Sequence, residues 1–557
     1  MAQYNDVSSI VIDLGFENTK IGYSGDENPK NIFSSNVGVP LDLEEKIKNE
    51  IYRKCLCTKD EFYMFNLIYP LFYLQPRENI KLKNCLYLDN KNNFNINEDV
   101  LEKILFMNIN GDRSVDKLIQ NRIKGFIGNK LYKQTDTGSE YIDADNNINE
   151  NDKNYTEVIN NAQTDSEQNN YNHITNDPNN LMSTLKEWSE ENGYFDLDVL
   201  ENSYIDICGI KNMLNKYNNV SCGLNENMEN FPYVFSLPNK RNKQIKTKIA
   251  ELLFEKYKIP AIYFNSKSIL TGFAYNKKVC SVVDIGSCYT DFSMCSDGII
   301  DDKNYNIYNI GGTSVDMFLE ELLQKHNNSS LVPYYESHKE KNIHTNKKDS
   351  YNSDNVHIDY YTKAKYIPLR DLKSYLCEVA NSENEINKAK NMALNEHVDI
   401  YILPDGQNIN ITKFTNIACE IFFTPSLLNE TAINSHLNNL YTKEQIFEGI
   451  PTTLFNMLQN IKSIEYRQDL LSNIILTGSS TLFQNFNERF INEFANLDMM
   501  NNGNFQNYQV LNNGKDFKKY SSWKGGSILS SFKNFNSFFV TRKEYEEFGF
   551  EIVNRKC

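Results

Sequence analysis

The sequence predicts a duplicated α/β fold whose two halves face each other across a cleft. The main observation is one pattern that occurs twice, in residues 8–26 and in residues 280–298. In each copy a β-branched strand ends in an aspartate (Asp13 or Asp284), a glycine-bearing turn follows, and a threonine precedes a second alternating segment, which is typical of a β-hairpin. A single copy would be explained as an ordinary strand exit. Two copies with matching flanks, one in each half of a 557-residue chain, favour a duplication.

Composition limits the class of protein. The chain has 58 Lys and Arg against 73 Asp and Glu, which gives a formal net charge of -15. Because an acidic chain has no global attraction for phosphate backbones or anionic lipids, we expect neither direct sequence-specific nucleic-acid binding nor a membrane partner. The first residues lack the cationic stretch of a signal peptide, and the apolar stretch at residues 63–74 is shorter than the ~20 residues of a membrane span.

Motifs of several familiar chemistries are not found in the sequence. The 11 cysteines form no CxxC pairs, which predicts reduced, mostly buried thiols of a cytosolic or nuclear protein. The sequence contains no GxxxxGK[ST] motif, so P-loop chemistry is not expected. None of the 7 histidines lies in a convincing catalytic triad.

Three polar segments interrupt the pattern of apolar residues. Residues 134–180 and 326–355 are rich in Asn, Asp, Glu and Gln, and they cannot bury enough apolar surface to offset the entropy lost on ordering. We therefore predict that both are disordered insertions. A shorter polar insertion of the same character is expected at about 499–515.

The order of further motifs along the chain resembles the actin family. The matching blocks, in family order, are IDLGFENTKIGYSGDENPK, FEKYKIPAIYFNSKSILTGFAYNKKVCSVVDIGS, NIGGTSVDMFLEELL, LRDLKSYLCEV, YILPDGQNINI, FFTPSLL, IILTGSSTLFQNFNERF and SSWKGGSILSSFKNFNSFFVTRKEYEEFG. The second block is most similar to the nuclear fourth class of actin-related proteins, which act in chromatin remodellers and histone acetyltransferase complexes. The resemblance implies the duplicated ribonuclease-H-like fold that actin shares with sugar kinases and heat-shock chaperone ATPases, with a central nucleotide cleft and polar insertions.

Carried over from the family, the first lobe covers residues 1–279 and the second covers residues 280–557. The first lobe includes a divergent second subdomain at about 40–114. The implied function is that of a scaffold subunit in a nuclear multi-subunit complex, with actin among its protein partners. The runner-up is a cytoplasmic actin-like protein that joins or caps cytoskeletal filaments. A sugar kinase or chaperone-type ATPase on the same duplicated fold is disfavoured, because Lys267 replaces the residue that positions water.

The resemblance also implies a bound nucleotide, ATP or ADP with Mg²⁺. The first phosphate turn of the family matches Asp13, Gly15 and Lys20, and the second matches Asp284 and Gly286. Glycine-bearing turns expose backbone N–H groups to anions, and a carboxylate before such a turn can hold Mg²⁺ through water. Asp13 and Asp284 are therefore the candidate metal residues. On the adenosine side, the matching positions are Gly312, Arg370, Lys373, Gly478 and Lys519.

Two departures weaken the prediction of nucleotide binding. Phe16 and Glu17 stand in the first turn, where the family has small residues near the phosphates. A bulky ring and an added negative charge both oppose an anion in that turn. The hairpins are therefore explained equally well as purely structural elements.

Hydrolysis is not expected, and no catalytic residue is predicted. The family orients its attacking water with a Gln and a His, and the matching residues here are Lys267 and Asp291. A charged lysine cannot accept a proton from water, and phosphoryl transfer depends on positioning. Lys267 is expected to pair with a phosphate or with Asp284.

An apolar groove for an amphipathic partner helix is implied at the hinge end of the lobes. The matching residues are Phe273 and Ala274, together with Leu529 and Phe532. Leu529 and Phe532 are three residues apart and are expected to share one helical face, whereas Ile528 is expected in the core. An exposed aromatic ring beside such a groove is a candidate hot spot for a partner.

Overall fold

The structure is a computed structural model in which part of the chain is described. The described residues are 8–49, 59, 63, 66–68, 73, 76–88, 93–110, 223–239 except 225, 243–327, 329–337, 353–382, 400–411 except 404, 415–430, and 447–557 except 502, 504 and 506.

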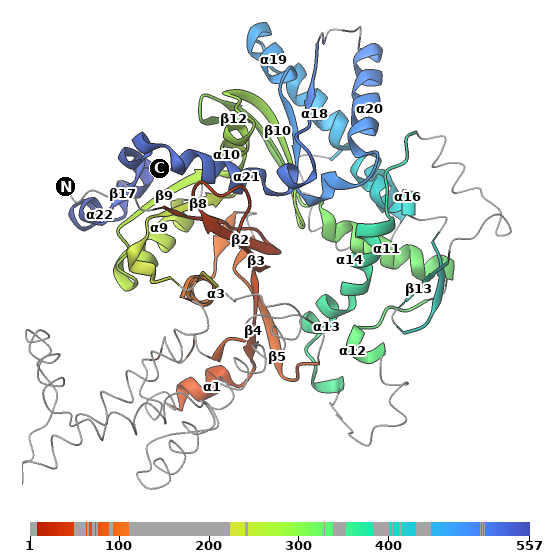
Figure 1. Ribbon diagram of the computed structural model, residues 1–557. Helices are drawn as coiled ribbons and strands as arrows, with labels where there is room; N and C mark the ends of the chain where they lie inside the picture. The colour runs from red at the N-terminus through yellow and green to blue at the C-terminus, as the bar shows by residue number, and fades with distance from the viewer. Residues whose placement is uncertain are drawn as a thin grey trace, which may run out of the picture. The chain divides into compact units, whose positions relative to one another are not determined.

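Two mixed β-sheets form the centre of this part of the chain (Figure 1). The six-stranded sheet has the order β17-β9-β8-β1-β2-β3, with β1 (Ile10–Asp13), β2 (Asn18–Tyr23), β3 (Asn31–Ser34), β8 (Tyr233–Leu237), β9 (Ala261–Ser266) and β17 (Val540–Thr541). The five-stranded sheet has the order β12-β11-β10-β15-β16, with β10 (Val279–Ile285), β11 (Thr290–Ser296), β12 (Ile299–Tyr308), β15 (Ile474–Thr477) and β16 (Val510–Leu511).

The two sheets repeat one pattern of strand pairing. β1 pairs with β2 antiparallel and with β8 parallel, and β10 pairs with β11 antiparallel and with β15 parallel. The outer strands follow the same rule, because β2–β3 and β11–β12 are antiparallel while β8–β9 and β15–β16 are parallel. The predicted duplicated α/β fold is therefore confirmed.

Both central strands are apolar because they are covered on both faces. The four residues of β1 are all buried, and the β-branched residues of β10 that follow Cys280 are fully buried as well. Strands of this kind occur where helices pack on both sides of a sheet. β1 nevertheless ends at Asp13, and Asp284 is the last residue but one of β10. These two carboxylates begin the candidate site.

Helices α10 (Lys267–Ala274) and α21 (Lys515–Ser531) pack against each other and contact strands of both sheets (Figure 1). Their approach is close at Gly525, where an added Cβ would lie 1.8 Å from the carbonyl oxygen of Leu270. Gly525 is therefore required by backbone contact between the two helices. Trp523 on α21 is fully buried, and its Nε1–H donates to the carbonyl of Val11, which fixes α21 against β1.

Other helices and small sheets complete the described part. The helices are α1 (Leu43–Lys48), α3 (Glu98–Asn110), α9 (Lys243–Glu251), α11 (Gly312–Asn327), α12 (Tyr334–Ser337), α13 (Ile358–Lys365), α14 (Ile367–Leu376), α16 (Thr415–Ala418), α18 (Ile450–Gln459), α19 (Ile464–Leu471), α20 (Phe486–Met500), α22 (Arg542–Phe548) and α23 (Glu551–Lys556). Two-stranded sheets pair β4 (Asn36–Pro40) with β5 (Ile80–Asn84), β6 (Leu86–Leu88) with β7 (Phe94–Ile96), and β13 (Ile400–Ile402) with β14 (Asn408–Asn410).

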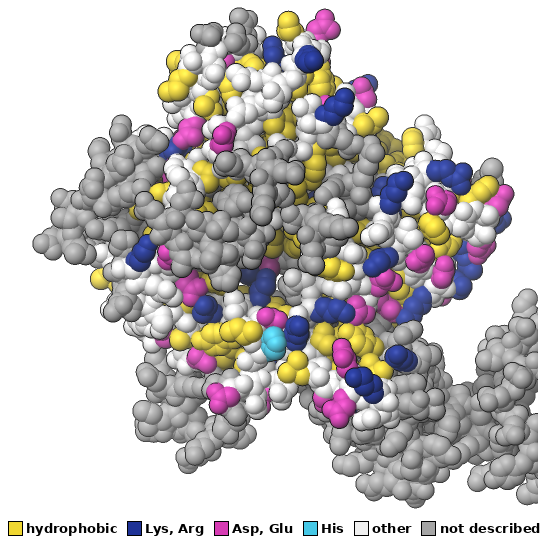
Figure 2. All heavy atoms as spheres, turned by 180° about the vertical axis from the view of Figure 1, so that it is seen from behind, with side chains coloured by type: hydrophobic (Ala, Val, Ile, Leu, Met, Phe, Trp, Pro, Cys, Tyr) yellow, Lys and Arg dark blue, Asp and Glu magenta, His cyan; other side chains and the backbone are white. Residues whose placement is uncertain are grey.

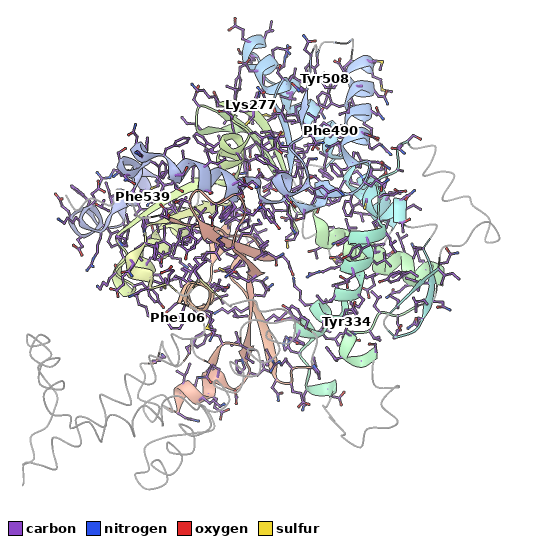
Figure 3. The ribbon with its side chains drawn as sticks, in the orientation of Figure 1. Phe106, Lys277, Tyr334, Phe490, Tyr508 and Phe539 are labelled. Carbon is purple, nitrogen blue, oxygen red and sulfur yellow. The ribbon has the colours of Figure 1, made fainter. Side chains whose placement is uncertain are left out.

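Separate apolar clusters support the two sheets. Phe490 belongs to the large cluster beside the five-stranded sheet, Tyr508 packs against that cluster, and Phe539 belongs to a cluster beside the six-stranded sheet (Figure 3). The large cluster also adjoins a buried ion pair, in which Arg489 Nη2 lies 2.6 Å from Oε1 of Glu420.

The C-terminal segment crosses back to the first sheet. Although the second lobe is predicted as residues 280–557, β17 pairs with β9, and α21 packs on β1 and β8. The physical reason is that β9 otherwise leaves an open edge, which β17 covers. Residues 280–557 therefore supply the whole five-stranded sheet and one strand of the other.

The predicted polar insertions have different outcomes. Residues 134–180 lie outside the described residues. Within 326–355, α12 forms and buries Tyr335 and Ser337, so the prediction of disorder is wrong for residues 334–337. Within 499–515, β16 extends the five-stranded sheet, and Phe505 is buried against Phe455 and Phe494, so this insertion carries core residues.

Charge is mixed on the described surface. On the face shown in Figure 2, acidic and basic side chains are interspersed over apolar ones. None of the described helices combines the length and the apolar composition that a membrane span requires.

Candidate functional site

The turns that follow β1 and β10 come together, and we call this place the hairpin junction. In the first hairpin Asp13 stands opposite Lys20, and in the second Asp284 stands opposite Asp291. Gly15 and Gly286 lie in the two turns. The duplication therefore places two carboxylates at equivalent strand ends, with a lysine facing one of them and a third carboxylate facing the other.

Asp13 is fully buried, and each of its carboxylate oxygens faces an ammonium group. Lys20 Nζ donates to Oδ2 at 2.5 Å, and Lys267 Nζ lies 2.9 Å from Oδ1. Burial opposes the charge on Asp13, but attraction by Lys20 and Lys267 outweighs it and holds the pKa of Asp13 well below its usual range. Asp13 is therefore an ionised carboxylate that is neutralised within the protein.

Lys267 begins α10 directly after β9, so its backbone is fixed at the end of the first sheet. Its side chain is 9% exposed. Burial alone would lower the pKa of Lys267, but attraction by Asp13 and then by Asp284 raises it, so the ammonium stays charged. The ion pair is formed with Asp13, whereas the sequence predicts a phosphate or Asp284 as the partner.

Aromatic rings meet between the two turns. The ring of Phe16 lies 5.5 Å from that of Tyr289 and 5.8 Å from that of Phe94, centroid to centroid, in edge-to-face arrangements. Phe16 belongs to the first turn and Tyr289 follows the second. The two turns are therefore joined by an aromatic contact.

Glu17 is bound by two cations from the second half of the chain. Lys363 Nζ donates to Oε2 at 2.6 Å, and Arg370 Nη1 lies 2.8 Å from Oε1. Burial raises the pKa of Glu17, but attraction by Lys363 and Arg370 outweighs it and lowers the pKa below its ordinary value. Glu17, which would oppose an anion in the first turn, therefore links α13 and α14 to the first hairpin.

The adenosine-side residues predicted from the sequence are partly brought together by Asp316 on α11. Lys373 Nζ lies 2.5 Å from Oδ1 of Asp316 and donates to the carbonyl of Gly312 at 2.9 Å. Arg370 Nε lies 3.8 Å from Oδ2 of the same carboxylate. Gly312, Arg370 and Lys373 therefore form one cluster, in which each cation already has an acidic partner.

Gly478 lies at the end of β15 against the second hairpin. Its φ is +94°, and an added Cβ would lie 2.2 Å from the carbonyl oxygen of Ile285 and 2.8 Å from Oδ1 of Asp284. Glycine is required here by both the backbone conformation and the close approach. Lys519 differs from the other predicted residues, because it is exposed with its Nζ 5.3 Å from the ring centroid of Tyr520, and none of the ion pairs among described residues includes it.

Asp291 is a buried carboxyl surrounded by neutral hydrogen-bond donors. Asn239 Nδ2 donates at 2.6 Å and Ser293 Oγ at 2.6 Å to Oδ1, and Tyr305 Oη donates at 2.8 Å to Oδ2. Burial raises the pKa of Asp291 to about 7, against the hydrogen bonds from Ser293 and Tyr305, which lower it. Both oxygens already accept hydrogen bonds, so Asp291 has a structural role at the family's water-orienting position.

Magnesium does not fit at Asp13 in this arrangement. Mg²⁺ takes oxygen ligands and keeps several waters, but both oxygens of Asp13 already face ammonium groups. The described residues also contain no group of three or more His, Cys, Asp or Glu side chains that could hold a metal ion. A nucleotide would gather cationic neighbours here, but its phosphates would compete with Glu17 and Asp316 for them.

The predicted partner surface is exposed and lies at the ends of two packed helices. Phe273 on α10 is 42% exposed and Phe532 is 59% exposed. Leu529 and Ala274 are half-buried, each packed against an apolar cluster. One expectation is wrong, because Ile528 is 40% exposed rather than part of the core. Phe532 is the C-cap of α21, and its backbone N–H donates to the carbonyl of Leu529.

Sequence reasoning does not identify several residues that contact the predicted site: Tyr289, Asp316, Lys363 and the three donors to Asp291. One signal could have pointed to Lys363, because Glu17 inside a predicted phosphate turn needs a cationic partner, and Lys363 shortly precedes Arg370 in the sequence. No comparable signal identifies Asp316 or Tyr289, whose neighbours are distant in sequence.

Similarity to known proteins extends over most of the chain. A family model described as Actin matches residues 4–557. Actin-related protein 4 of Oryza sativa subsp. japonica is 29% identical over 339 residues, 59% of this chain and 72% of the relative. Putative actin-29 of Dictyostelium discoideum is 28% identical over 57% of this chain and 69% of the relative, and actin-related protein 4 of Arabidopsis thaliana is 26% identical over 58% and 71%.

Proposed function

The chain belongs to the actin family, and from that premise we propose that it is an actin-related scaffold subunit of a nuclear chromatin-remodelling or histone acetyltransferase complex. It is an actin-related protein similar to the plant proteins named actin-related protein 4. In this proposal the chain works by binding other proteins, and hydrolysis of ATP is not part of its function.

The observation that carries the proposal is the ion pair between Lys267 and Asp13. An ammonium group stands where the family resemblance implies a residue that orients water, and it cannot accept a proton. At the second such position, both oxygens of Asp291 are occupied by donors from the protein. Because phosphoryl transfer depends on positioning and electrostatic stabilisation, these replacements argue against efficient turnover.

An adenine nucleotide is proposed as a ligand that is held weakly and without turnover. The gathering of Lys20, Arg370, Lys373 and Gly312 around the hairpin junction supports some affinity for an anion. Competition from Glu17 keeps that affinity low. A native-state ligand must raise the melting temperature, so ADP and ATP added to the full chain without metal test this part of the proposal.

The protein partner is proposed to be an amphipathic helix that packs on the exposed side chains of Phe273 and Phe532. Exposed aromatic side chains next to half-buried apolar ones are typical of such anchors, and each fully covered side chain gains ~1.5–3 kcal/mol. Actin is a candidate neighbour in the same complex.

A cytoskeletal function is the second candidate, favoured by the similarity to putative actin-29. The cytoskeletal function predicts head-to-tail assembly, which requires complementary faces on one chain. The scaffold function predicts instead that purified full chain in polymerising salt remains in the supernatant after sedimentation. A pellet that contains helical filaments would favour the cytoskeletal function.

Affinity purification tests the proposed scaffold function. The tagged full chain should be found in the nucleus and should copurify with subunits of one chromatin-modifying complex. Recovery from the cytoplasm with filament proteins alone would overturn the proposal.

A further inference from the structure

We propose that the ammonium group of Lys267 takes the place of a divalent cation at the hairpin junction, so that the protein holds the two hairpins together without bound metal. This inference rests on the proposed function, in which the junction does not hydrolyse ATP. In this inference Lys267 has a structural role as an internal cation. That role goes beyond the replacement of a water-orienting residue.

The geometry of Asp13 supports this role directly. Asp13 is 0% exposed, with Lys20 Nζ 2.5 Å from one carboxylate oxygen and Lys267 Nζ 2.9 Å from the other. A divalent ion, or a water bound to it, would need one of these oxygens. The two ammonium groups therefore already supply the positive charge that a buried carboxylate requires.

The position of Lys267 is fixed by its surroundings. The backbone N–H of Ser268, the next residue of α10, donates to Oδ1 of Asn239 at 2.9 Å, and Asn239 Nδ2 donates back to Ser268 Oγ at 2.7 Å. The start of α10 is thus anchored beside the second hairpin, because Asn239 also donates to Asp291. Lys267 is held in place by the fold and does not reach the junction as a flexible surface lysine.

Lys267 supplies one of two positive charges that act on both Asp13 and Asp284. Lys20 and Lys267 attract Asp13, and both also act electrostatically on Asp284, whose pKa is raised by burial. Replacing Lys267 by a neutral residue removes one of these positive charges and frees Oδ1 of Asp13. Such a site has the oxygen ligands that divalent cations bind.

The test compares melting temperatures of the full chain in excess EDTA and in millimolar MgCl₂ or MnCl₂. The wild type should change by less than about 1 °C, since no native-state site is filled. Lys267→Gln should melt lower than the wild type in EDTA and should regain roughly 2–4 °C when the divalent cation is added. A metal-insensitive Lys267→Gln, or a wild type that loses stability in EDTA, would overturn the inference.

Two controls separate this effect from a general response to charge. Lys363→Gln makes the same change of charge but leaves Asp13 paired and leaves Glu17 bound to Arg370, so it should stay insensitive to metal. The double variant Lys267→Gln/Asp13→Asn removes the freed carboxylate, and its response to metal should disappear. A response in either control would assign metal binding to another place and overturn the inference.

Titration of the wild type with Mn²⁺, followed by electron paramagnetic resonance, gives an answer even when the variants fail to fold. The inference expects all added Mn²⁺ to remain free at micromolar concentrations, and one tightly bound Mn²⁺ per chain would contradict it. Failure of the proposed function has a different signature, because ATP hydrolysis by the wild type contradicts that function, whereas metal binding without hydrolysis contradicts only this inference.

Discussion

The ammonium group of Lys267 lies 2.9 Å from Oδ1 of Asp13, and this contact joins the start of α10 to the end of β1. The other carboxylate oxygen of Asp13, Oδ2, accepts a hydrogen bond from Lys20 on the opposing strand of the hairpin. The carboxylate of Asp13, at the end of β1, is therefore neutralised by two lysines. At the two positions where the resemblance implies water-orienting groups, this chain has Lys267 and Asp291.

Replacing Asp291 by Asn should make stability less dependent on pH. The pKa of Asp291 is raised from 3.8 to about 7, chiefly by burial. A carboxyl with a raised pKa in the folded chain contributes stability that is fully present below its unfolded pKa and is lost as pH rises through about 7. The melting temperature of Asp291→Asn relative to the wild type should therefore rise between about pH 5 and about pH 8, by roughly 1–3 °C. An equal difference at both pH values would show that Asp291 is ionised throughout.

Removing the buried Arg489 should be strongly destabilising. Arg489 is 1% exposed, and it binds Glu420, which is 0% exposed, and the carbonyl of Ala380. Arg489→Met leaves the Glu420 carboxylate buried without its partner, which costs about 3–5 kcal/mol. Urea denaturation should show this as a lower midpoint of unfolding.

An exposed pair provides the matched control for Arg489. Arg542 and Glu546 form an ion pair at 2.8 Å on the surface of α22, with side chains 40% and 59% exposed. Arg542→Met should change the free energy of unfolding by no more than ~0.5 kcal/mol. Similar losses in both variants would contradict the assignment of Arg489 to a buried network.

Phe532→Asp should reduce recovery of the partner without unfolding the protein. Phe532 is 59% exposed and lies after the end of α21, so a carboxylate there remains in water. Loss of an aromatic anchor at an interface typically lowers affinity about tenfold or more. Quantitative copurification should show this loss, while the melting temperature stays within about 1 °C of the wild type.

Ile400→Asp is the control for that surface. Ile400 is 62% exposed at the start of β13, which pairs with β14 and belongs to neither of the sheets that α10 and α21 contact. This control variant should copurify with as much of the partner as the wild type does. If Phe532→Asp recovers the partner equally well, or if it is insoluble, the interaction surface lies elsewhere.

The sequence predicts the hairpins well because their signals are local. A β-branched strand, an aspartate, a glycine turn and an alternating strand lie within residues 8–26 and again within 280–298, and both copies form the paired strands expected of them. The identity of Asp13 and Asp284 as equivalent strand-end residues follows from the same pattern. These features need no information from distant parts of the chain.

Features that depend on distant contacts are not predictable in this way. Glu17 meets Lys363 and Arg370 only because α13 and α14 fold back onto the first hairpin. The place of β17 in the first sheet depends on which edge is open, and the exposure of Ile528 depends on what packs beside α21. In each case the outcome is decided by tertiary packing, which overrides local propensity.

Steady-state phosphate release tests the central claim most directly. Wild-type full chain, Lys267→Ala and a conventional actin should be assayed together with ATP and Mg²⁺. The account predicts that the wild type releases phosphate no faster than Lys267→Ala and far more slowly than conventional actin, because neither Lys267 nor Asp291 can orient the attacking water. Release by the wild type at a rate comparable to actin, and well above that of Lys267→Ala, would contradict it.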